Sequence, residues 1–459
     1  MSSRRETGRL ERALVAGLLL LLLWLPLPLG SNRPWAMALL IALVGLLALG
    51  WALGVLSQRI ALPRALRAAL PLFALLLLVQ LWAVLQYTLF GSADTGRSAL
   101  YIALGLAYSL LFLLIVGLFA ERQRLNWLLA VLVVSGTLQA FYGAFMALSG
   151  VEWSLLGIPQ VSKGVATGTF VNRNHFAGYL ELALGCGIGL LMALRSNERF
   201  SWANFIELIM GPKARLRLAL VIMVIALVMS RSRGGNSAFF IALLAVGTLF
   251  VIRTKQNRKR NILILLSIIL IDTLVVSQYF GLERLKDRIV NTRLVDQVAT
   301  NSRGEVEVIQ QANEIRGQVF LDALPLAQEK LLLGQGAGSF ETVFPQFGSA
   351  AVRLHFDHLH NDYLQFVIEY GVLATGLLAI FVLGCLWFGL RALWQSRSEY
   401  RAGLALGVCM GLVSLLIHSL SDFNLQIPAN AATFVVLCAL AVLAKEHSHK
   451  QRHHAVIDQ

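Results

Sequence analysis

The run SALYIALGLAYSLLFLLIVGLFA, residues 98–120, contains no charged side chain. A helix of about 20 apolar residues crosses the ~30 Å hydrocarbon core of a bilayer, because a helix rises about 1.5 Å per residue. Similar runs recur along the chain, which is 57% hydrophobic and 14% charged, with mean hydropathy +0.70. Soluble chains average about 45–50% apolar and about 25% charged residues. We therefore expect an all-α polytopic membrane protein, since a helix satisfies its backbone polar groups internally.

Twelve such runs are predicted to span the membrane. The first follows an Arg-rich terminus, and we expect an uncleaved span there because no clear small-residue cleavage site follows it. The seventh and eighth runs are short and adjacent, so a single kinked helix is the alternative for that pair. The predicted spans are residues 13–31, 35–56, 68–90, 98–120, 127–149, 174–194, 216–230, 236–252, 261–280, 361–390, 402–420 and 429–444.

Lys and Arg residues are concentrated in alternate loops. Membrane proteins keep such residues in short cytoplasmic loops, so we place these loops and the N-terminus in the cytoplasm. This pattern accounts for the net charge of +14 without nucleic acid. It predicts a multi-pass protein of the bacterial inner membrane with both termini cytoplasmic. The basic loops are residues 59–67, 122–124, 195–217, 253–260 and 391–401.

One long loop divides the chain. Residues 1–280 are expected to form an N-terminal bundle of about nine spans, and residues 361–444 about three further spans, followed by a cytoplasmic tail at 445–459. Residues 281–360 then lie on the periplasmic side. Helical character at 305–330, together with many Phe, Val and Leu residues, predicts that this loop folds as a partly helical cap over the membrane domain.

Four polar clusters interrupt the apolar pattern: residues 171–179, 230–235, 355–363 and 418–424. They stand out by composition alone. The topology, which is drawn largely from other residues, puts all four at periplasmic ends of spans. We therefore expect them to meet in one site on that side of the membrane.

Three arginines of these clusters, Arg173, Arg231 and Arg233, are unusual because basic residues are disfavoured in short external loops. A guanidinium group binds phosphate oxygens as a fork and stays charged at any working pH. A lipid diphosphate at the membrane surface would suit them. The alternative is that each arginine extends to headgroup phosphates.

His360 is the candidate for proton chemistry, because a neutral imidazole can take a proton from a hydroxyl group near pH 7. A helix-capping or otherwise structural histidine is the alternative. His355 and His358, with Asp357 and Asp362, would also suit a metal ion. Their spacing matches no standard zinc motif, and no second ligand cluster is evident.

Acidic side chains inside apolar runs are candidates for functional roles. Glu369 lies in the tenth span and Glu181 in the sixth, although either carboxylate could simply pair with a neighbouring helix. His418 and Asp422 are four residues apart, so they could share a helix face. One of them could orient a catalytic group, or both could simply close the helix end.

Several motifs carry a family resemblance that covers roughly residues 160–430. His360-Asn361 followed by Gly371 resembles the signature of the O-antigen ligase and polymerase superfamily, with Ala374 where the family has a second small residue. The remaining motifs similar to this superfamily are the Gly-rich segment 334–341 and residues 170–179, 230–234 and 422–428.

The resemblance implies a metal-independent, inverting glycosyltransferase of the GT-C type that needs no cofactor. Its donor would be a glycan on undecaprenyl diphosphate, and its acceptor a hydroxyl group of lipid A core, of another glycan or of another molecule, in lipopolysaccharide or exopolysaccharide biosynthesis. His360 matches the family's catalytic base. Arg316 is the best match to a diphosphate-binding arginine, which Arg173, Arg231 and Arg233 would complement. The supporting residues would be Asn361, His175, Glu369, His418 and Asp422.

Two alternatives to a ligase remain. A polymerase would transfer the growing chain to another lipid-linked repeat, and the ending at 422–428 resembles the exopolysaccharide branch. A transporter of lipid-linked glycans would also need many spans with charges inside the membrane. Transporters are commonly built from internal repeats with binding sites at mid-membrane. The sequence shows no repeat, and its polar residues gather at one face.

Overall fold

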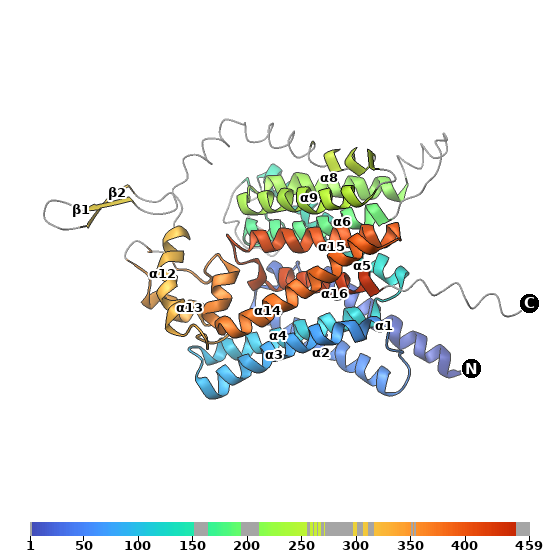
Figure 1. Ribbon diagram of the computed structural model, residues 1–459, viewed down its shortest axis with the longest axis horizontal. Helices are drawn as coiled ribbons and strands as arrows, with labels where there is room; N and C mark the ends of the chain where they lie inside the picture. Colours follow the sequence, from blue (N-terminus) through green and yellow to red (C-terminus); the bar gives the residue numbers. More distant parts are fainter. Residues whose placement is uncertain are drawn as a thin grey trace, which may run out of the picture.

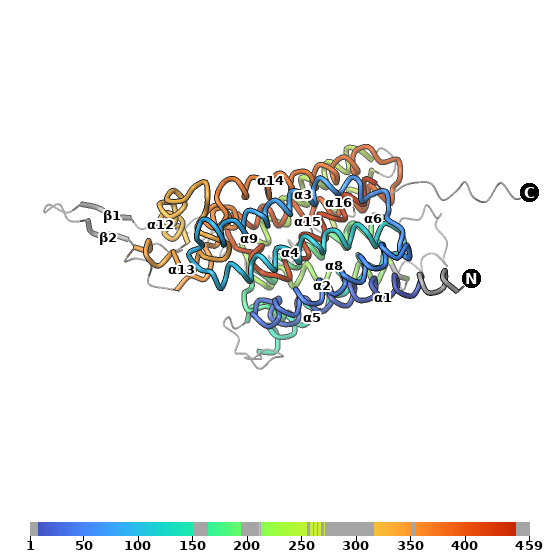
Figure 2. Tube along the Cα trace, turned by 90° about the horizontal axis from the view of Figure 1, so that it is seen from below, coloured from blue at the N-terminus to red at the C-terminus, as the bar shows by residue number. Residues whose placement is uncertain are grey.

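The computed structural model describes most of the chain. The described residues are 2–150, 164–193, 211–254, 258–259, 261–263, 265–267, 270, 297–300, 306–310, 316–349, 352 and 355–446. In these residues the long helices lie side by side along the longest axis of the molecule (Figure 1). A smaller group of elements projects at one end, and the chain begins at the opposite end, as both views show (Figure 2).

Long α-helices make up the membrane domain. In chain order they are α1 (Ser2–Trp24), α2 (Pro34–Leu56), α3 (Ala65–Leu85), α4 (Thr95–Leu118), α5 (Arg122–Ser149), α6 (Arg173–Ala193), α8 (Pro212–Met229), α9 (Arg233–Arg253), α14 (Asp362–Gln395), α15 (Glu399–His418) and α16 (Pro428–Glu446). Short helical turns extend three of their connections: η1 (Leu29–Ser31), the π-helical turn η2 (Gln86–Phe90) and η4 (Asn424–Gln426).

Nine of the described helices are long and apolar enough to cross a membrane: α2, α3 with η2, α4, α5, α6, α9, α14, α15 and α16. Of the twelve predicted spans, 13–31 falls largely on α1 and 216–230 on α8. Both helices are present but carry charged residues near their N-terminal ends. The seventh and eighth predicted spans are two separate helices and not one kinked element. The predicted span 261–280 lies mostly outside the described residues.

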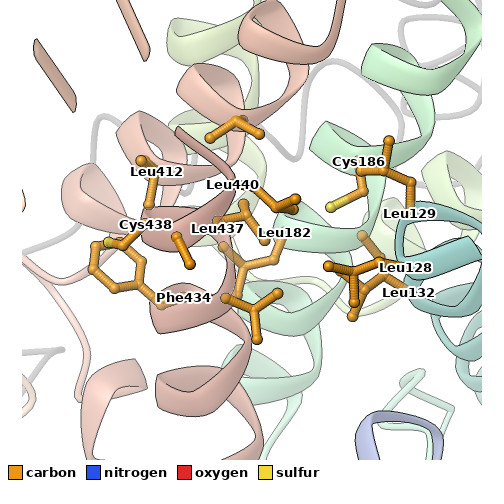
Figure 3. Packing of buried hydrophobic residues seen from close by; sticks show 14 of the residues in the cluster. Leu128, Leu129, Leu132, Leu182, Cys186, Leu412, Phe434, Leu437, Cys438 and Leu440 are labelled. Carbon is orange, nitrogen blue, oxygen red and sulfur yellow. The ribbon is translucent and has the colours of Figure 1, made fainter. Parts of the chain in front are cut away.

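The centre of the bundle is formed by α6, which is buried along its whole length after Arg173. Its neighbour α15 approaches it closely, because glycines face each other across the contact. A methyl group on Gly185 would lie 2.7 Å from the carbonyl oxygen of Gly407. Leucine side chains from α5, α6, α15 and α16 fill the space around these helices (Figure 3). Small residues are the usual means of close helix packing in membranes, since lipid provides no hydrophobic driving force between helices.

The long loop folds in part as a cap at one end of the bundle. A hairpin of β1 (Gln297–Thr300) and β2 (Val306–Gln310) precedes α12 (Arg316–Glu329), α13 (Phe340–Val343) and η3 (Phe344–Gln346). The predicted helical character at 305–330 is therefore wrong for its first residues. The stretch Val306-Glu307-Val308 alternates apolar and polar residues, which suits a strand. The cap packs on a core of its own that includes Val319, Leu326 and Phe340.

The helix α14 is broken at Gly371, where φ is +72°. The Gly-rich turn that follows α12 packs into the break, since Gln335 N donates to the carbonyl of Ile368 and Gly336 N to that of Glu369. A methyl group on Gly371 would meet Leu332 O at 2.2 Å. Only glycine combines this φ with so close an approach. The break therefore joins the cap to the membrane domain.

Candidate functional site

Four elements meet at the cap end of the bundle. His175 lies in the first turn of α6, Arg316 is the first residue of α12, and His360 lies two residues before the start of α14. Asp422 stands in the turn between α15 and η4. Far apart in sequence, these side chains come together because each belongs to the terminus of a helix that ends or begins at the same end of the bundle.

Asp422 is the centre of this group and is fully buried. Its Oδ2 accepts a hydrogen bond from Asn174 Nδ2 at 2.5 Å and lies 3.7 Å from Arg316 Nη1. Its Oδ1 lies 3.3 Å from His175 Nε2 and 3.7 Å from His360 Nδ1. One carboxylate thus lies within 4 Å of the charged or basic groups of an arginine and two histidines, and we call these residues, together with Asn174, the Asp422 cluster.

The charge state of the Asp422 cluster follows from its surroundings. Burial raises the pKa of the Asp422 carboxyl group, but the nearby imidazoles of His175 and His360 outweigh burial, and the pKa lies well below its usual range. The carboxylate is therefore ionised at neutral pH. An ionised carboxylate next to an imidazole fixes the ring orientation and stabilises the ring when it takes up a proton.

His360 is held in a conformation that non-glycine residues seldom adopt, with φ at +59°. The next residue, Asn361, caps α14: its Oδ1 accepts from Leu364 N at 3.0 Å, and its Nδ2 donates to Leu420 O at 3.0 Å. A left-handed residue carries a conformational cost that the surrounding contacts must offset. Asn361 thus ties the His360 backbone to the turn that carries Asp422.

The ring of Phe423 packs against three histidine rings. The rings of His175, His358 and His360 lie 4.4, 4.6 and 4.7 Å from its ring centroid. Gln365 Nε2 donates to His358 Nδ1 at 2.8 Å, and burial lowers the pKa of the His358 imidazole to about 3. His358 is therefore neutral and packs as a ring, whereas the His360 side chain is 17% exposed.

A second buried carboxylate, Glu181, lies deeper in the bundle and does not contact Asp422. Glu181 Oε1 pairs with His418 Nδ1 at 2.7 Å, and Glu181 Oε2 accepts from Ser414 Oγ at 2.6 Å. These three residues form the Glu181 cluster. The start of α9 packs directly on it, since a methyl group on Gly235 would lie 3.0 Å from Glu181 Oε1. The predicted supporting residue His418 thus belongs to a separate, closed cluster. Since α15 ends at His418, it shares no helix face with Asp422.

Glu369 also lies away from the Asp422 cluster, and its carboxylate holds the Gly-rich turn. Glu369 Oε2 accepts from Gly338 N at 3.1 Å, and Glu369 Oε1 from Gln365 Nε2 at 3.0 Å. Gln365 Oε1 in turn accepts from Leu359 N at 3.0 Å. Glu369 therefore connects the cap to the backbone just before His360.

The remaining predicted arginines lie at helix starts of the same end. Arg173 and Arg233 are exposed, as the first residues of α6 and α9. Arg231 is half-buried, with φ at +53°. A methyl group on Gly234, the residue after Arg233, would lie 2.8 Å from Ser421 Oγ. The turn before α9 thus adjoins the turn that carries Asp422.

The predicted metal alternative was built on His355, His358, His360, Asp357 and Asp362. Their side chains have other partners: His355 Nε2 lies 2.9 Å from Glu341 Oε1, and Asp362 Oδ2 accepts from Ser419 Oγ at 2.7 Å. Among the residues that the structure describes, no group of three or more His, Cys, Asp or Glu side chains could hold a metal ion.

A comparison with known protein families adds to this description of the site. The O-antigen ligase family model matches residues 218–379. The chain is a multi-pass membrane protein with an O-antigen ligase domain over residues 218–379. A search of curated proteins returned no match. The family segment contains Arg231, Arg233, Arg316 and His360, together with Gly371. His175 and Asp422 lie outside it and complete the Asp422 cluster from the flanking helices.

Two residues in or beside the Asp422 cluster were not predicted as site residues. Asn174 donates to Asp422, and Phe423 packs against three histidines. The available signal was their position inside two of the four polar clusters, next to His175 and Asp422. Their partners lie between 63 and 248 residues away in sequence, so only the folded chain identifies the contacts.

Proposed function

We propose that this protein is an enzyme of the O-antigen ligase family, which transfers a glycan from undecaprenyl diphosphate to an acceptor hydroxyl group, with inversion at the anomeric carbon and without a metal ion. The observation that carries the proposal is the convergence of His360, His175 and Arg316 on the buried carboxylate of Asp422. A base, its orienting acid and a cation that suits a phosphate stand together between cap and bundle.

The chemistry needs two things that this cluster supplies. The acceptor hydroxyl must lose its proton as its oxygen bonds to the anomeric carbon, and His360, oriented by Asp422, would take that proton. The bond from the anomeric carbon to the diphosphate oxygen breaks in the same step, and negative charge develops on the leaving diphosphate. Arg316 would bind that charge, with Arg173, Arg231 and Arg233 as further cations on the same end of the bundle.

The topology that we propose has twelve spans, both termini in the cytoplasm and the cap in the periplasm of a bacterial inner membrane. The distribution of Lys and Arg residues supports this orientation. One contact in the structure supports the proposed number of spans. Arg253, the last residue of α9, donates to the carbonyl of Trp394 near the end of α14, away from the cap. The chain must return to the cap before Arg316, and the predicted span 261–280 would supply that crossing.

The decisive experiment compares wild type with His360→Ala, using undecaprenyl-diphosphate-linked glycan as donor and EDTA in the buffer. The acceptors are lipid A core and, separately, a second lipid-linked repeat. His355→Ala is the matched control, since His355 is an exposed histidine of the same segment. We expect wild type and the control to form acceptor-linked glycan, detected by gel and mass spectrometry. The His360→Ala variant should bind donor but lose about 10²-fold or more in rate.

The outcomes separate the competing functions. Product on lipid A core indicates a ligase, and product on the lipid-linked repeat indicates a polymerase of the same family. Equal rates for wild type and His360→Ala would overturn the role of His360 as base. Loss of activity in EDTA would overturn metal independence. If no acceptor is modified but wild type moves labelled lipid-linked glycan across proteoliposomes, the protein is a transporter.

A further inference from the structure

The cap carries an apolar surface that its own core does not use. The surface has two parts: one face of α12, and the three leucines that follow Lys330. Between 38% and 61% of each of these leucines is exposed, although Val319, Ala323 and Leu326 on the opposite face of α12 are buried. The exposed leucines are Leu321, Leu324, Leu331, Leu332 and Leu333, and we call them the leucine edge.

Backbone contacts fix the level of Leu331 to Leu333, the second part of the leucine edge, relative to the membrane helices. Val372 N donates to the carbonyl of Leu331 at 2.9 Å, and Gln86 Nε2 donates to the carbonyl of Leu333. Val372 follows the break in α14, and Gln86 begins η2 at the end of α3. Leu331 to Leu333 therefore lie beside the ends of two candidate spans, with their backbone bonded inward and their side chains exposed.

The neighbouring surfaces of those spans are apolar and exposed as well. On η2, Leu89 is 70% and Phe90 is 47% exposed, and on α14, Leu373 is 52% exposed. Because α3 with η2 and α14 are candidate spans, we expect exposed apolar side chains at their ends to face lipid. The leucine edge continues this lipid-facing surface onto the cap.

Aromatic and basic residues lie at the level of Leu331 to Leu333, as is typical of a membrane–water interface. Trp82 donates from Nε1 to the carbonyl of Tyr370 and packs against Phe90, while Tyr87 is 42% exposed. Trp and Tyr gather at the headgroup level of bilayers. Lys330 is exposed directly before the three leucines, where a long basic side chain can extend to headgroup phosphates.

We propose that the leucine edge is immersed in the bilayer, among the headgroups and upper acyl chains of the leaflet on the cap side. Lipid is the occupant because the edge is continuous with the lipid-facing surfaces of α3, η2 and α14. Segment 330–333 then acts as an interfacial anchor that holds the cap at a fixed depth. This inference depends on the membrane spans and not on the proposed chemistry.

The test attaches an environment-sensitive fluorophore to a cysteine introduced by Leu332→Cys. Labelling is specific because the four native cysteines are buried. The labelled protein is reconstituted in vesicles of phosphatidylethanolamine and phosphatidylglycerol that carry a doxyl quencher either near the headgroup or near the chain end. Leu383→Cys, exposed in mid-α14, is the lipid control, and Asp357→Cys, an exposed acidic position of the cap segment, is the water control.

We expect the label at position 332 to lose roughly half its fluorescence to the shallow quencher and less to the deep one, as for an interfacial element. The label at 383 should respond more to the deep quencher, and the label at 357 to aqueous iodide. Leu324→Cys serves as a second position should Leu332→Cys fail to fold. The proposal is wrong if the label at 332 is quenched no more by lipid than that at 357.

Two other occupants give distinct results, and each would overturn the proposal. If a second copy of the chain covers the edge, labels at 332 will quench one another and crosslink between molecules as protein concentration rises. If a polyisoprenyl chain is the specific occupant, the label will be quenched by iodide until undecaprenyl diphosphate is added. Neither result requires transfer activity, so failure here leaves the proposed function untouched.

Discussion

Two buried carboxylates in this protein each face a histidine, yet they differ in what surrounds them. In the Glu181 cluster, the carboxylate, His418 and Ser414 come from two regular helices, and α9 packs over them. In the Asp422 cluster, the partners come from the ends of separate elements, and His360 has a left-handed backbone and is partly exposed.

We interpret this difference as that between a structural and a functional arrangement. A carboxylate–histidine pair that is satisfied within helices joins those helices and has no access to a ligand. The Asp422 cluster gathers an arginine and two histidines at helix termini beneath the cap, and it bears backbone strain at His360. Strained residues and helix termini are where binding and catalysis concentrate. The segment that matches the family model contains Arg316 and His360 of the Asp422 cluster and no residue of the Glu181 cluster.

The largest expected effect comes from Asp422→Asn. This variant keeps the shape of the side chain and removes the charge that orients His360 and Arg316. We expect the rate of glycan transfer to fall about 10²-fold or more, because the base loses its orienting group. Donor binding should fall less. The comparison is made with Asp357→Asn, an exposed carboxylate of the cap segment that should retain wild-type activity. An active Asp422→Asn enzyme would reduce the cluster to a structural contact.

The effect of Asp422→Asn on thermal stability should also depend on pH. The pKa of Asp422 is lowered in the folded protein, so its carboxylate stabilises the fold above the unfolded pKa of about 3.9, and this stability is lost as pH falls through the folded value. The difference in thermal stability between wild type and Asp422→Asn should be constant from about pH 5 to 8 and narrow below about pH 4. A difference that changes near neutral pH would contradict the lowered pKa.

The next largest effect is on the free energy of unfolding, and it comes from the Glu181 cluster. Glu181→Ala leaves His418 and Ser414 without their acceptor in the centre of the bundle, which should cost roughly 3 kcal/mol or more in the free energy of unfolding. Thermal unfolding in detergent measures it. The double variant Glu181→Leu, His418→Leu should recover much of that loss, because apolar replacement of a buried pair is often neutral. Transfer per folded molecule should persist in the double variant; its loss would give the Glu181 cluster a role in catalysis.

Much of the fold followed from the sequence because lipid imposes a simple rule. Apolar runs such as 98–120 had to be helices, and nine of the described helices satisfy the length and composition of a span. The polar clusters at 171–179, 355–363 and 418–424 were found for the same reason. Polar groups in an apolar chain need partners, so a cluster of them stands out against the apolar runs. His175, His360, Arg316 and Asp422 were predicted separately, and the structure brings them together.

What the sequence did not reveal depends on long-range contacts. The role of Glu369 in holding the Gly-rich turn depends on the break at Gly371, which an apolar run does not disclose. The predicted pairing of His418 with Asp422 assumed a helix that in fact ends between them. Glu181 was the correct partner of His418, but its position 237 residues away gave no periodic signal. Local patterns thus predicted the elements, while pairings between elements required the fold.

The smallest effect compares the two histidines through their backbones. His360 has φ at +59°, so glycine fits there better than alanine; His418 lies in α15, where alanine is preferred. We expect His360→Gly to be more stable than His360→Ala by about 1 kcal/mol, and His418→Gly to be less stable than His418→Ala by up to about 1 kcal/mol. Side-chain loss is the same within each pair, so thermal unfolding of the four variants isolates the backbone. Both His360 variants should lack transfer activity. If His360→Gly were no more stable than His360→Ala, the strain would not exist, and the feature that best distinguishes the Asp422 cluster from the Glu181 cluster would be lost.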